Sequence, residues 1–498
     1  MPRTSNAAGF EYPPSLWNQM LPALASEGTT IQGTLRSRFI DAILDRRVPP
    51  GTRLPSSREL ASLLKISRNT VVLVFEQLVA EGYLDSRPRS GFFVNALPMP
   101  TAAELASSQA NNSSPNWDNR IAPRAAGQKW LERPRDWQQY PFPFIYGQFD
   151  VDLFPVDAWR DCSHLALAQS EVNLWAADAV DRDDPLLIEQ LRRNVLPRRG
   201  IEARPQEIMV TLGTQNAIFL LAATLVKPGA SVAVEDPGYM DARNILRHCG
   251  ARVTGVPVDE NGMTVAQSLA KCDLLYCTPS HQCPTGVTMT TDRRLAILRQ
   301  AVYHDFVIIE DDYDAETQYS GHALPSLKAL DRSGRVIYIG GVSKTLSPGL
   351  RIGYIVGPEQ VIERARELRR LVIRHPPANN QRALALFIAQ GHNDHLLRRI
   401  RSTLAVRAAA ITAALHRHLP DFRFIEPTGG SAIWLQGPEG LDTTKLAEEA
   451  LRRGVVIEPG SSYLPDPAGP VNYTRLGYSS IPAERIELGI LALKKSLD

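Results

Sequence analysis

Short runs of β-branched and other apolar residues alternate with helical stretches between residues 208 and 356. The runs are Ile208–Thr211, Ser231–Val234, Leu274–Cys277, Phe306–Glu310, Val336–Gly340 and Ile352–Val356. Strands that are separated by helices usually run parallel in one sheet, and the helices then cover both of its faces. The pattern therefore predicts an α/β domain with a mostly parallel central sheet, which we expect over residues 141–498.

A different pattern precedes this domain. Apolar residues recur four positions apart and predict a first helix with one buried side, at Ile31, Leu35, Phe39 and Ile43. Ser56 followed by Glu59 is a capping box for a second helix, and Ser67 can cap a third. Residues 83–94 include Gly91 and predict a hairpin. Together these elements predict a winged helix-turn-helix, mainly α, over residues 28–95.

This N-terminal head carries most of the basic excess of the chain. Residues 31–94 hold ten Lys and Arg against six Asp and Glu, whereas the whole chain has a formal net charge of +2. Arg68, Asn69 and Thr70 open the third predicted helix, the position from which a recognition helix contacts bases. Arg87 and Arg89 flank the hairpin tip, where they can bind phosphates. We predict that the head binds DNA; binding of a protein is the alternative.

Residues 96–140 are rich in Pro, Ala, Asn and Ser and predict a linker. Trp117, Trp130 and Trp137 indicate that its second half packs against a folded part of the chain. The five cysteines show no CxxC spacing and no paired histidines, which argues against a metal site and a disulfide framework. The longest apolar run is far short of the ~20 residues that span a bilayer. We expect a cytoplasmic protein with no metal and no membrane partner.

Two of the predicted strands end in residues that bear on chemistry. Asp311 lies at the end of one strand, and Lys344 follows the next one along the chain. Ligands of open α/β sheets bind at this edge. A lysine that forms a Schiff base and an aspartate that keeps a pyridinium nitrogen protonated are the two groups that pyridoxal phosphate requires. The pair predicts a pyridoxal 5'-phosphate site.

Further residues suit the rest of such a cofactor. Gly213, Thr214 and Gln215 turn from a strand into a helix, whose N-terminus offers free N–H groups to a phosphate. Arg351 can add a bidentate guanidinium. Tyr239 is a candidate to stack on the ring.

Longer motifs resemble a known DNA-binding family. Residues 49–61, together with Ser67–Val71 and Glu81–Leu84, closely resemble the winged helix-turn-helix of the GntR family. The resemblance implies a set of DNA-binding residues, namely Arg58, Arg68, Asn69, Thr70, Arg87 and Arg89. Arg89 departs from the small residue that is usual there and adds a charge.

Residues 141–498 look like a fold-type I aminotransferase domain, and their pairing with the head resembles the MocR/GabR family of pyridoxal-phosphate-dependent regulators. The resemblance rests on Thr278–Gly286, Glu310–Asp314 and Ser343–Leu346. It implies a role for each site residue: Lys344 as the Schiff-base lysine, Asp311 at the pyridine nitrogen, Tyr313 at the ring hydroxyl, Ser343, Arg351 and the Gly213–Gln215 turn at the phosphate, and Arg475 at the carboxylate of a ligand. Cys283 replaces the asparagine that aminotransferases place against the ring hydroxyl, which weakens the case for efficient catalysis.

The resemblance implies a transcription regulator that senses a small amino compound, which would replace Lys344 on the cofactor by transimination. Members of the family form domain-swapped, head-to-tail homodimers, so two heads would bind paired or repeated half-sites. Asp241 lies where a GABA-responsive relative has an arginine, which argues against a GABA-like ligand. The alternative function is an active aminotransferase that carries a DNA-binding module, with Lys344 and Asp311 as catalytic residues. A residual half-reaction is compatible with the regulator as well.

Overall fold

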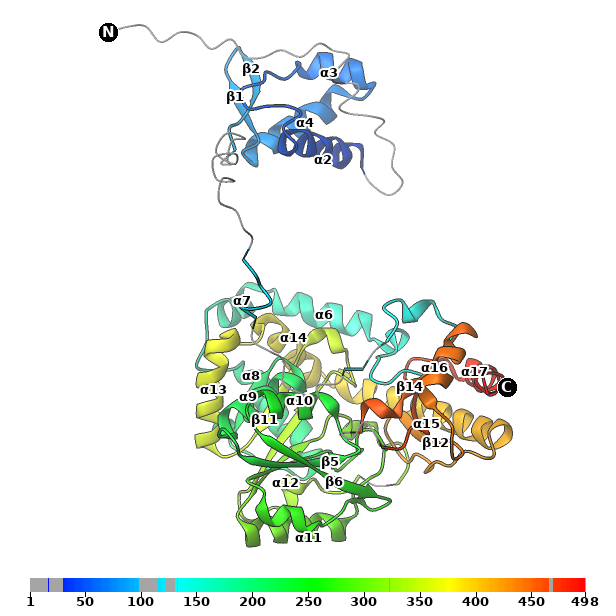
Figure 1. Ribbon diagram of the computed structural model, residues 1–498. Helices are drawn as coiled ribbons and strands as arrows, with labels where there is room; N and C mark the ends of the chain where they lie inside the picture. Colours follow the sequence, from blue (N-terminus) through cyan, green and yellow to red (C-terminus); the bar gives the residue numbers. More distant parts are fainter. Residues whose placement is uncertain are drawn as a thin grey trace. The chain divides into compact units, whose positions relative to one another are not determined.

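The computed structural model describes Trp17 and residues 30–97, 115–121, 130–131, 133–321, 323–464 and 469–497. It divides into two compact units, residues 1–122 and 123–498 (Figure 1). Part of the segment that we expected as linker, residues 98–114, lies outside the described residues. The second unit begins at residue 123, so it includes the C-terminal part of that segment.

The first unit has the expected winged helix-turn-helix, built from α2 (Ile31–Leu44), α3 (Ser57–Leu64), α4 (Arg68–Ala80), β1 (Leu84–Arg87) and β2 (Gly91–Val94). The capping box is present, because Ser56 Oγ accepts from the Glu59 N–H at 3.2 Å while Glu59 Oε2 accepts from the Ser56 N–H at 2.8 Å. Ser67 caps α4 by accepting from the Thr70 N–H. Both predicted N-caps are confirmed.

The core of the head forms where the helices meet. Phe39 and Phe75 are fully buried, with ring centroids 5.7 Å apart in an edge-to-face arrangement. The predicted apolar side of α2 is correct for Leu35, Phe39 and Ile43, but Ile31 is 51% exposed. Ile31 is the first residue of α2, and it lies beyond the edge of this core.

The second unit is built around a sheet whose strands lie in the order β4 (Ile208–Thr211), β11 (Gly353–Val356), β10 (Val336–Gly341), β9 (Val307–Asp311), β8 (Leu274–Cys277), β5 (Ser231–Asp236), β6 (Arg252–Asp259) and β7 (Gly262–Met263). Neighbouring strands from β10 to β6 pair in parallel, whereas β11 and β7 are antiparallel to their neighbours. The mostly parallel sheet is confirmed. Its parallel strands direct their C-terminal ends, including Asp311, to one edge.

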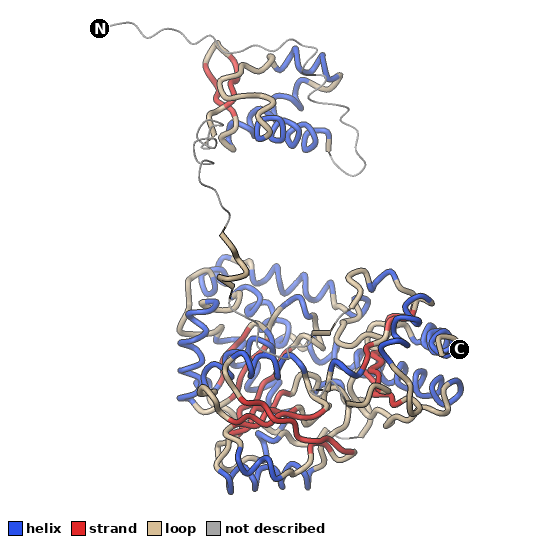
Figure 2. Tube along the Cα trace, viewed as in Figure 1, coloured by secondary structure: helices blue, strands red, loops and turns tan. Residues whose placement is uncertain are grey.

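Helices pack on both faces of this sheet, as Figure 2 shows for the blue helices on either side of the red strands. One face carries α9 (Gly213–Leu225), α10 (Met240–His248) and α13 (Glu359–Ile373), whose apolar side chains share a core with the strands. The other face carries α11 (Thr291–His304) and α12 (Leu327–Leu330). The helices fix the positions of the strands, so they also fix the residues at the strand ends.

The rest of the second unit forms a further core beside the sheet. Its helices are α6 (Val156–Ala166), α7 (Gln169–Trp175), α8 (Pro185–Gln190), α14 (Ala378–Ala389), α15 (His392–His418), α16 (Thr443–Arg452) and α17 (Ala483–Lys494). Its strands are β12 (Ala432–Gln436), β15 (Tyr473–Gly477) and β14 (Glu458–Pro459) in one sheet, and β13 (Val455–Val456) with β3 (Phe142–Pro143) in another. Among the described residues no helix has the length and apolar character to cross a membrane.

Candidate functional site

Asp311 is the last residue of β9, and only one of its two carboxylate oxygens is hydrogen-bonded to the described residues. Its Oδ2 accepts a hydrogen bond of 2.7 Å from the Tyr276 hydroxyl. Its Oδ1 is buried and has no hydrogen-bond partner among the described residues. Burial raises the pKa of Asp311 to about 7, although the Tyr276 hydrogen bond lowers it. A buried, unpartnered carboxylate oxygen needs a partner with a proton to share, and a protonated ring nitrogen is such a partner.

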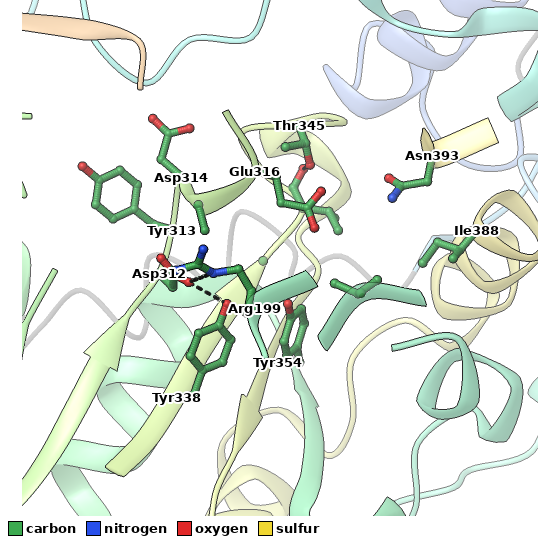
Figure 3. A pocket seen from close by; sticks show the side chains of 14 residues that line it. Arg199, Asp312, Tyr313, Asp314, Glu316, Tyr338, Thr345, Tyr354, Ile388 and Asn393 are labelled. Carbon is green, nitrogen blue, oxygen red and sulfur yellow. Dashed lines mark hydrogen bonds and ion pairs between the residues drawn. The ribbon is translucent and has the colours of Figure 1, made fainter. Parts of the chain in front are cut away.

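The neighbouring acids of this strand are committed to other partners. Glu310 accepts from the backbone N–H groups of Leu327 at 2.7 Å and Lys328 at 2.8 Å. Asp312 accepts from Arg199 Nε at 2.7 Å and from the Tyr338 hydroxyl at 2.9 Å, within a polar pocket that Figure 3 shows. Burial opposes ionisation of Asp312, but Arg199 holds its pKa below the usual value. Asp312 Oδ1, like Asp311 Oδ1, is buried without a hydrogen-bond partner among the described residues, but the ion pair with Arg199 already neutralises Asp312. Glu310 and Asp312 therefore stabilise the fold, while Asp311 is the acid left for a ligand.

Lys344 lies three residues beyond the end of β10, against an aromatic ring. Its Nζ is 4.2 Å from the centroid of the Tyr146 ring. Gly147 leaves room for it, because a Cβ at that position would lie 2.7 Å from Lys344 Nζ. Burial lowers the pKa of Lys344 to about 8, against the opposing effect of Asp314. A lysine with a lowered pKa is more often neutral, which is the form that attacks an aldehyde.

The N-terminus of α9 forms a close-packed turn beside Arg351. Gly213 begins the helix with φ +78°, and Arg351 Nη2 donates to the carbonyl of Leu212 at 2.8 Å. A Cβ on Gly213 would come within 3.0 Å of Arg351 Nη2. Thr214 lies close to the end of β10, since a Cβ on Gly341 would be 3.1 Å from its methyl group. Free N–H groups and a guanidinium thus converge where a phosphate can bind.

Tyr239, Tyr313 and Cys283 belong to one apolar cluster. The Tyr313 hydroxyl donates to the carbonyl of His281 at 2.7 Å. The Tyr239 hydroxyl donates to Asp241 Oδ2 at 3.2 Å, and Gln215 Nε2 donates to the same oxygen at 3.3 Å. Burial raises the pKa of Cys283 to about 11, although Arg475 lowers it. Cys283 is therefore a neutral thiol and a weak hydrogen-bond donor.

Arg475 presents a guanidinium to the same pocket. It lies on β15 with 2% of its surface exposed, and its Cζ is 3.4 Å from the centroid of the Tyr146 ring. Nη1 contacts Cys283 Sγ at 3.6 Å and donates to the Tyr463 hydroxyl at 3.4 Å. Nε is buried without a hydrogen-bond partner among the described residues. A buried guanidinium with unused donors suits the carboxylate of a ligand.

Sequence reasoning placed Asp311, Lys344, Cys283 and Arg475 in one region, and the structure brings them together around Tyr146 and the Cys283 cluster. It also places Ser343 beside Lys344, half-buried. Sequence reasoning missed four residues that line this region: Arg133, Tyr146, Glu458 and Tyr463. Glu458 begins the two-residue strand β14, and the other three lie outside the helices and strands, so no periodic pattern marks any of them.

Arg133 lies in the segment that we expected as linker. Its Nη2 is 2.5 Å from Glu458 Oε1, and the nearby Leu131 packs against the Cys283 cluster. The three tryptophans were expected to make this packing, but Trp117 is 63% exposed and Trp130 is 53% exposed, while Trp137 is half-buried. The contact is thus made by Leu131 and Arg133, which carry no sequence signal of their own.

The head exposes most of the residues that we predict to bind DNA. Arg58, Arg68, Asn69, Arg87 and Arg89 are exposed, while Thr70 is half-buried. The Thr70 hydroxyl is 2.8 Å from the Ser67 hydroxyl, so it takes part in the cap of α4.

The wing arginines differ in how they are held. Arg87 lies 4.3 Å above the Phe93 ring and pairs with Asp85 at 3.0 Å. Arg89 lies at the hairpin tip with φ +64°, in the left-handed region. The extra charge at this tip therefore comes with a strained backbone.

Family models match both units. Residues 32–94 match the gntR family of bacterial regulatory proteins, and residues 178–490 match the aminotransferase class I and II family. Among curated proteins, the HTH-type transcriptional regulator TauR of Rhodobacter capsulatus is 42% identical, covering 94% of this chain and 96% of its own length. The probable rhizopine catabolism regulatory protein MocR of Rhizobium meliloti is 33% identical over 91% of both chains.

Solved structures of aminotransferases match 76–77% of this chain. Kynurenine aminotransferase of Pyrococcus horikoshii, determined in complex with PMP, aligns with a TM-score of 0.71 and 28% identity, covering 77% of this chain and 98% of the other. The aminotransferase-like architecture and the N-terminal regulatory module are thus each supported by independent similarity.

Proposed function

This chain belongs to the MocR/GabR-type family, which joins a GntR-type DNA-binding head to an aminotransferase-like domain that uses pyridoxal phosphate, and from this premise we propose that it is a transcription regulator that senses a small amino compound. The observation that carries the sensing role is the meeting of Lys344 and Arg475 on one aromatic ring, that of Tyr146. Lys344 can hold an aldehyde, and Arg475 can bind the acidic group of a compound whose amine competes with Lys344 for that aldehyde.

The described residues fit pyridoxal phosphate. When it is bound, this cofactor supplies an aldehyde that reacts with primary amines and a ring that accepts electron density. We assign the free oxygen of Asp311 to the ring nitrogen, whose proton it would hold. The Gly213–Gln215 turn, Ser343 and Arg351 would bind the phosphate. Tyr239 would cover the ring, with Tyr313 and Cys283 near its hydroxyl.

Arg475 indicates the chemical class of the effector. It is buried, charged and short of acceptors in its own protein, so a ligand that brings a carboxylate or another anion would be bound favourably. The amino group of the same ligand would compete with Lys344 for the aldehyde. We therefore propose an amino compound that also carries an acidic group.

We propose that the head binds DNA through Arg58, Arg68, Asn69, Thr70, Arg87 and Arg89. We also propose a domain-swapped, head-to-tail homodimer that binds paired or repeated half-sites. This assembly is the one that the family resemblance implies, and a partner subunit would cover apolar side chains of the second unit such as Leu167, Leu174 and Leu371, which are 62%, 55% and 83% exposed.

An active aminotransferase is the second candidate function, because Asp311 and Lys344, the two groups that this chemistry requires, follow neighbouring parallel strands and so lie at the same edge of the sheet. Two observations favour the regulator: Cys283 is a poor substitute for an amide donor, and the relatives that align over the whole chain are named as regulators. A turnover assay with amino donors and 2-oxo acids tests this choice. Steady turnover at the ~1–1000 per second of ordinary enzymes would favour the aminotransferase.

A further inference from the structure

We propose that Arg133 is a positioning residue for effector recognition: it neutralises Glu458 and thereby leaves Arg475 free to bind the acidic group of the effector. This inference rests on the proposed function, in which Arg475 binds that group. It assigns a role in the pocket to a residue at the C-terminal end of the segment that joins the head to the second unit.

A continuous chain of polar contacts links the two arginines. Arg133 Nη2 lies 2.5 Å from Glu458 Oε1. Glu458 Oε2 accepts from the Tyr463 hydroxyl at 3.0 Å, and that hydroxyl accepts from Arg475 Nη1 at 3.4 Å. Glu458 Oε1 also accepts from the backbone N–H of Tyr146, and the ring of Tyr146 lies against the Arg475 guanidinium. The carboxylate therefore stands between the two guanidinium groups, with Arg133 as its direct partner.

The sheet keeps Glu458 within reach of Arg475 as well. The two residues are directly opposite each other on the antiparallel strands β14 and β15. Side chains at directly opposed positions project from the same face of a sheet, with Cβ atoms about 5 Å apart. Glu458 is 1% exposed and Arg475 is 2% exposed, so water cannot satisfy either charge. If Arg133 were lost, Arg475, directly opposite on β15, would be a cation available to this buried carboxylate.

This competition matters because Arg475 has spare hydrogen-bonding capacity. Its Nε has no partner among the described residues, and its Nη1 makes only long contacts to a thiol and a hydroxyl. A buried charge without a counter-charge is strongly unfavourable. Glu458 would then draw the Arg475 guanidinium to itself, and the donors meant for the effector would be occupied.

Arg133 is held in place for this role by its neighbours. Its side chain is 25% exposed, and its Nε is buried. Leu131 anchors the same segment against the cluster of Met240, Cys283 and Tyr463. Arg135, two residues further on, is exposed and serves as a matched control.

The test uses two pairs of amines, and the members of each pair differ only in that a methyl group replaces the carboxylate. The full chain is loaded with pyridoxal phosphate and titrated with each amine while the absorbance of the bound cofactor is recorded. The first pair is L-alanine and isopropylamine, and the second is 3-aminopropanoate and propylamine. The ratio of the two dissociation constants in each pair reports recognition of the carboxylate alone. We expect Arg133→Ala to reduce the preference for the amino acid by at least about tenfold, the value of one charged hydrogen bond, and Arg135→Ala to leave it unchanged.

Rescue separates this role from a general effect on folding. In Arg133→Ala/Glu458→Gln the competing carboxylate is gone, so the preference should return to within about threefold of the unmodified chain. Arg133→Lys keeps the charge and should retain most of the preference. An Arg133→Ala chain with an unchanged ratio, or a double variant no better than the single one, would overturn the proposal.

Arg475→Ala separates the role of Arg475 as the site of the acidic group from the role of Arg133 as its positioning residue. If it leaves the preference for amino acids intact, the proposed function of this pocket is wrong. If it abolishes the preference while Arg133→Ala does not change it, the proposed function stands and the positioning role of Arg133 is wrong.

Discussion

Lys344 and Arg475 share one aromatic ring: Lys344 Nζ lies 4.2 Å from the centroid of Tyr146, and Arg475 Cζ lies 3.4 Å from it. The ring keeps two cations from different parts of the chain in one pocket, because each is attracted to the electron-rich faces of an aromatic side chain. The group that would hold the cofactor and the group that would bind the effector are therefore set at a fixed separation.

Replacing Tyr146 should disturb effector recognition through this ring. We expect Tyr146→Ala to weaken the binding of amino acids by about threefold to thirtyfold, the usual range of partly desolvated cation–π contacts. Tyr146→Phe keeps the ring and loses only a hydroxyl that has no partner among the described residues, so it should bind as the unmodified chain does. Absorbance titration of the loaded protein measures both variants. Equal losses in the two would show that the hydroxyl matters and the ring does not.

Asp311→Asn should weaken cofactor binding. The neutral amide cannot stabilise a protonated ring nitrogen, and loss of a charged hydrogen bond in a buried site corresponds to about tenfold or more in affinity. The dissociation constant of pyridoxal phosphate, from dialysis or absorbance titration, provides the measurement. Asp292→Asn, on the exposed side of α11, is the matched control and should have no effect. Unchanged affinity in Asp311→Asn would remove Asp311 from the cofactor site.

Cofactor uptake should rise with pH and level off near the lowered pKa of Lys344. Burial brings this pKa to about 8, so the reactive neutral amine is ~10% of the population at pH 7, against ~0.03% for an ordinary lysine. Below pH 8 the uptake rate should fall about tenfold per pH unit, and above it the rate should become constant. Stopped-flow absorbance with the cofactor-free chain gives the profile. A rate that still rises between pH 9 and 10 would contradict a lowered pKa.

Arg89→Gly should separate the stability of the head from its affinity for DNA. Arg89 has φ +64°, a conformation that costs other residues about 1–2 kcal/mol and glycine almost nothing. The variant head should therefore unfold at higher denaturant concentration. If Arg89 binds a phosphate, the variant should also bind DNA more weakly, with a salt slope reduced by about 1. Arg47→Ala, elsewhere on the head, is the control and should leave the salt slope of DNA binding unchanged. A salt slope that does not change in Arg89→Gly would exclude the phosphate contact.

Local patterns predicted the strands and caps well. The β-branched runs located β4, β5, β8, β9, β10 and β11, and Ser56, Glu59 and Ser67 marked the starts of α3 and α4. The residues at the strand ends followed, since parallel strands bring Asp311 and Lys344 to the same edge. The antiparallel direction of β11 was not predicted, because it depends on the loop of residues 342–352, which returns the chain so that Gly353 pairs with Gly341.

Other parts of the site depend on contacts between distant segments. Glu458 and Arg475 become neighbours only through the pairing of β14 with β15, and Arg133 reaches them from more than three hundred residues away in the sequence. No periodicity or motif encodes such a contact. Linker composition even pointed away from Arg133, because Ala, Pro, Asn and Ser are frequent in the preceding residues, while Trp117 and Trp130, which seemed better anchors, are exposed.

Chemical trapping tests directly whether Lys344 holds pyridoxal phosphate. The purified chain is loaded with the cofactor, reduced with borohydride, digested and analysed by mass spectrometry. We predict one phosphopyridoxyl group per chain, on the peptide that contains Lys344, and none in Lys344→Ala. A chain that takes up no cofactor, or one that carries it on another lysine such as Lys328, would contradict the account.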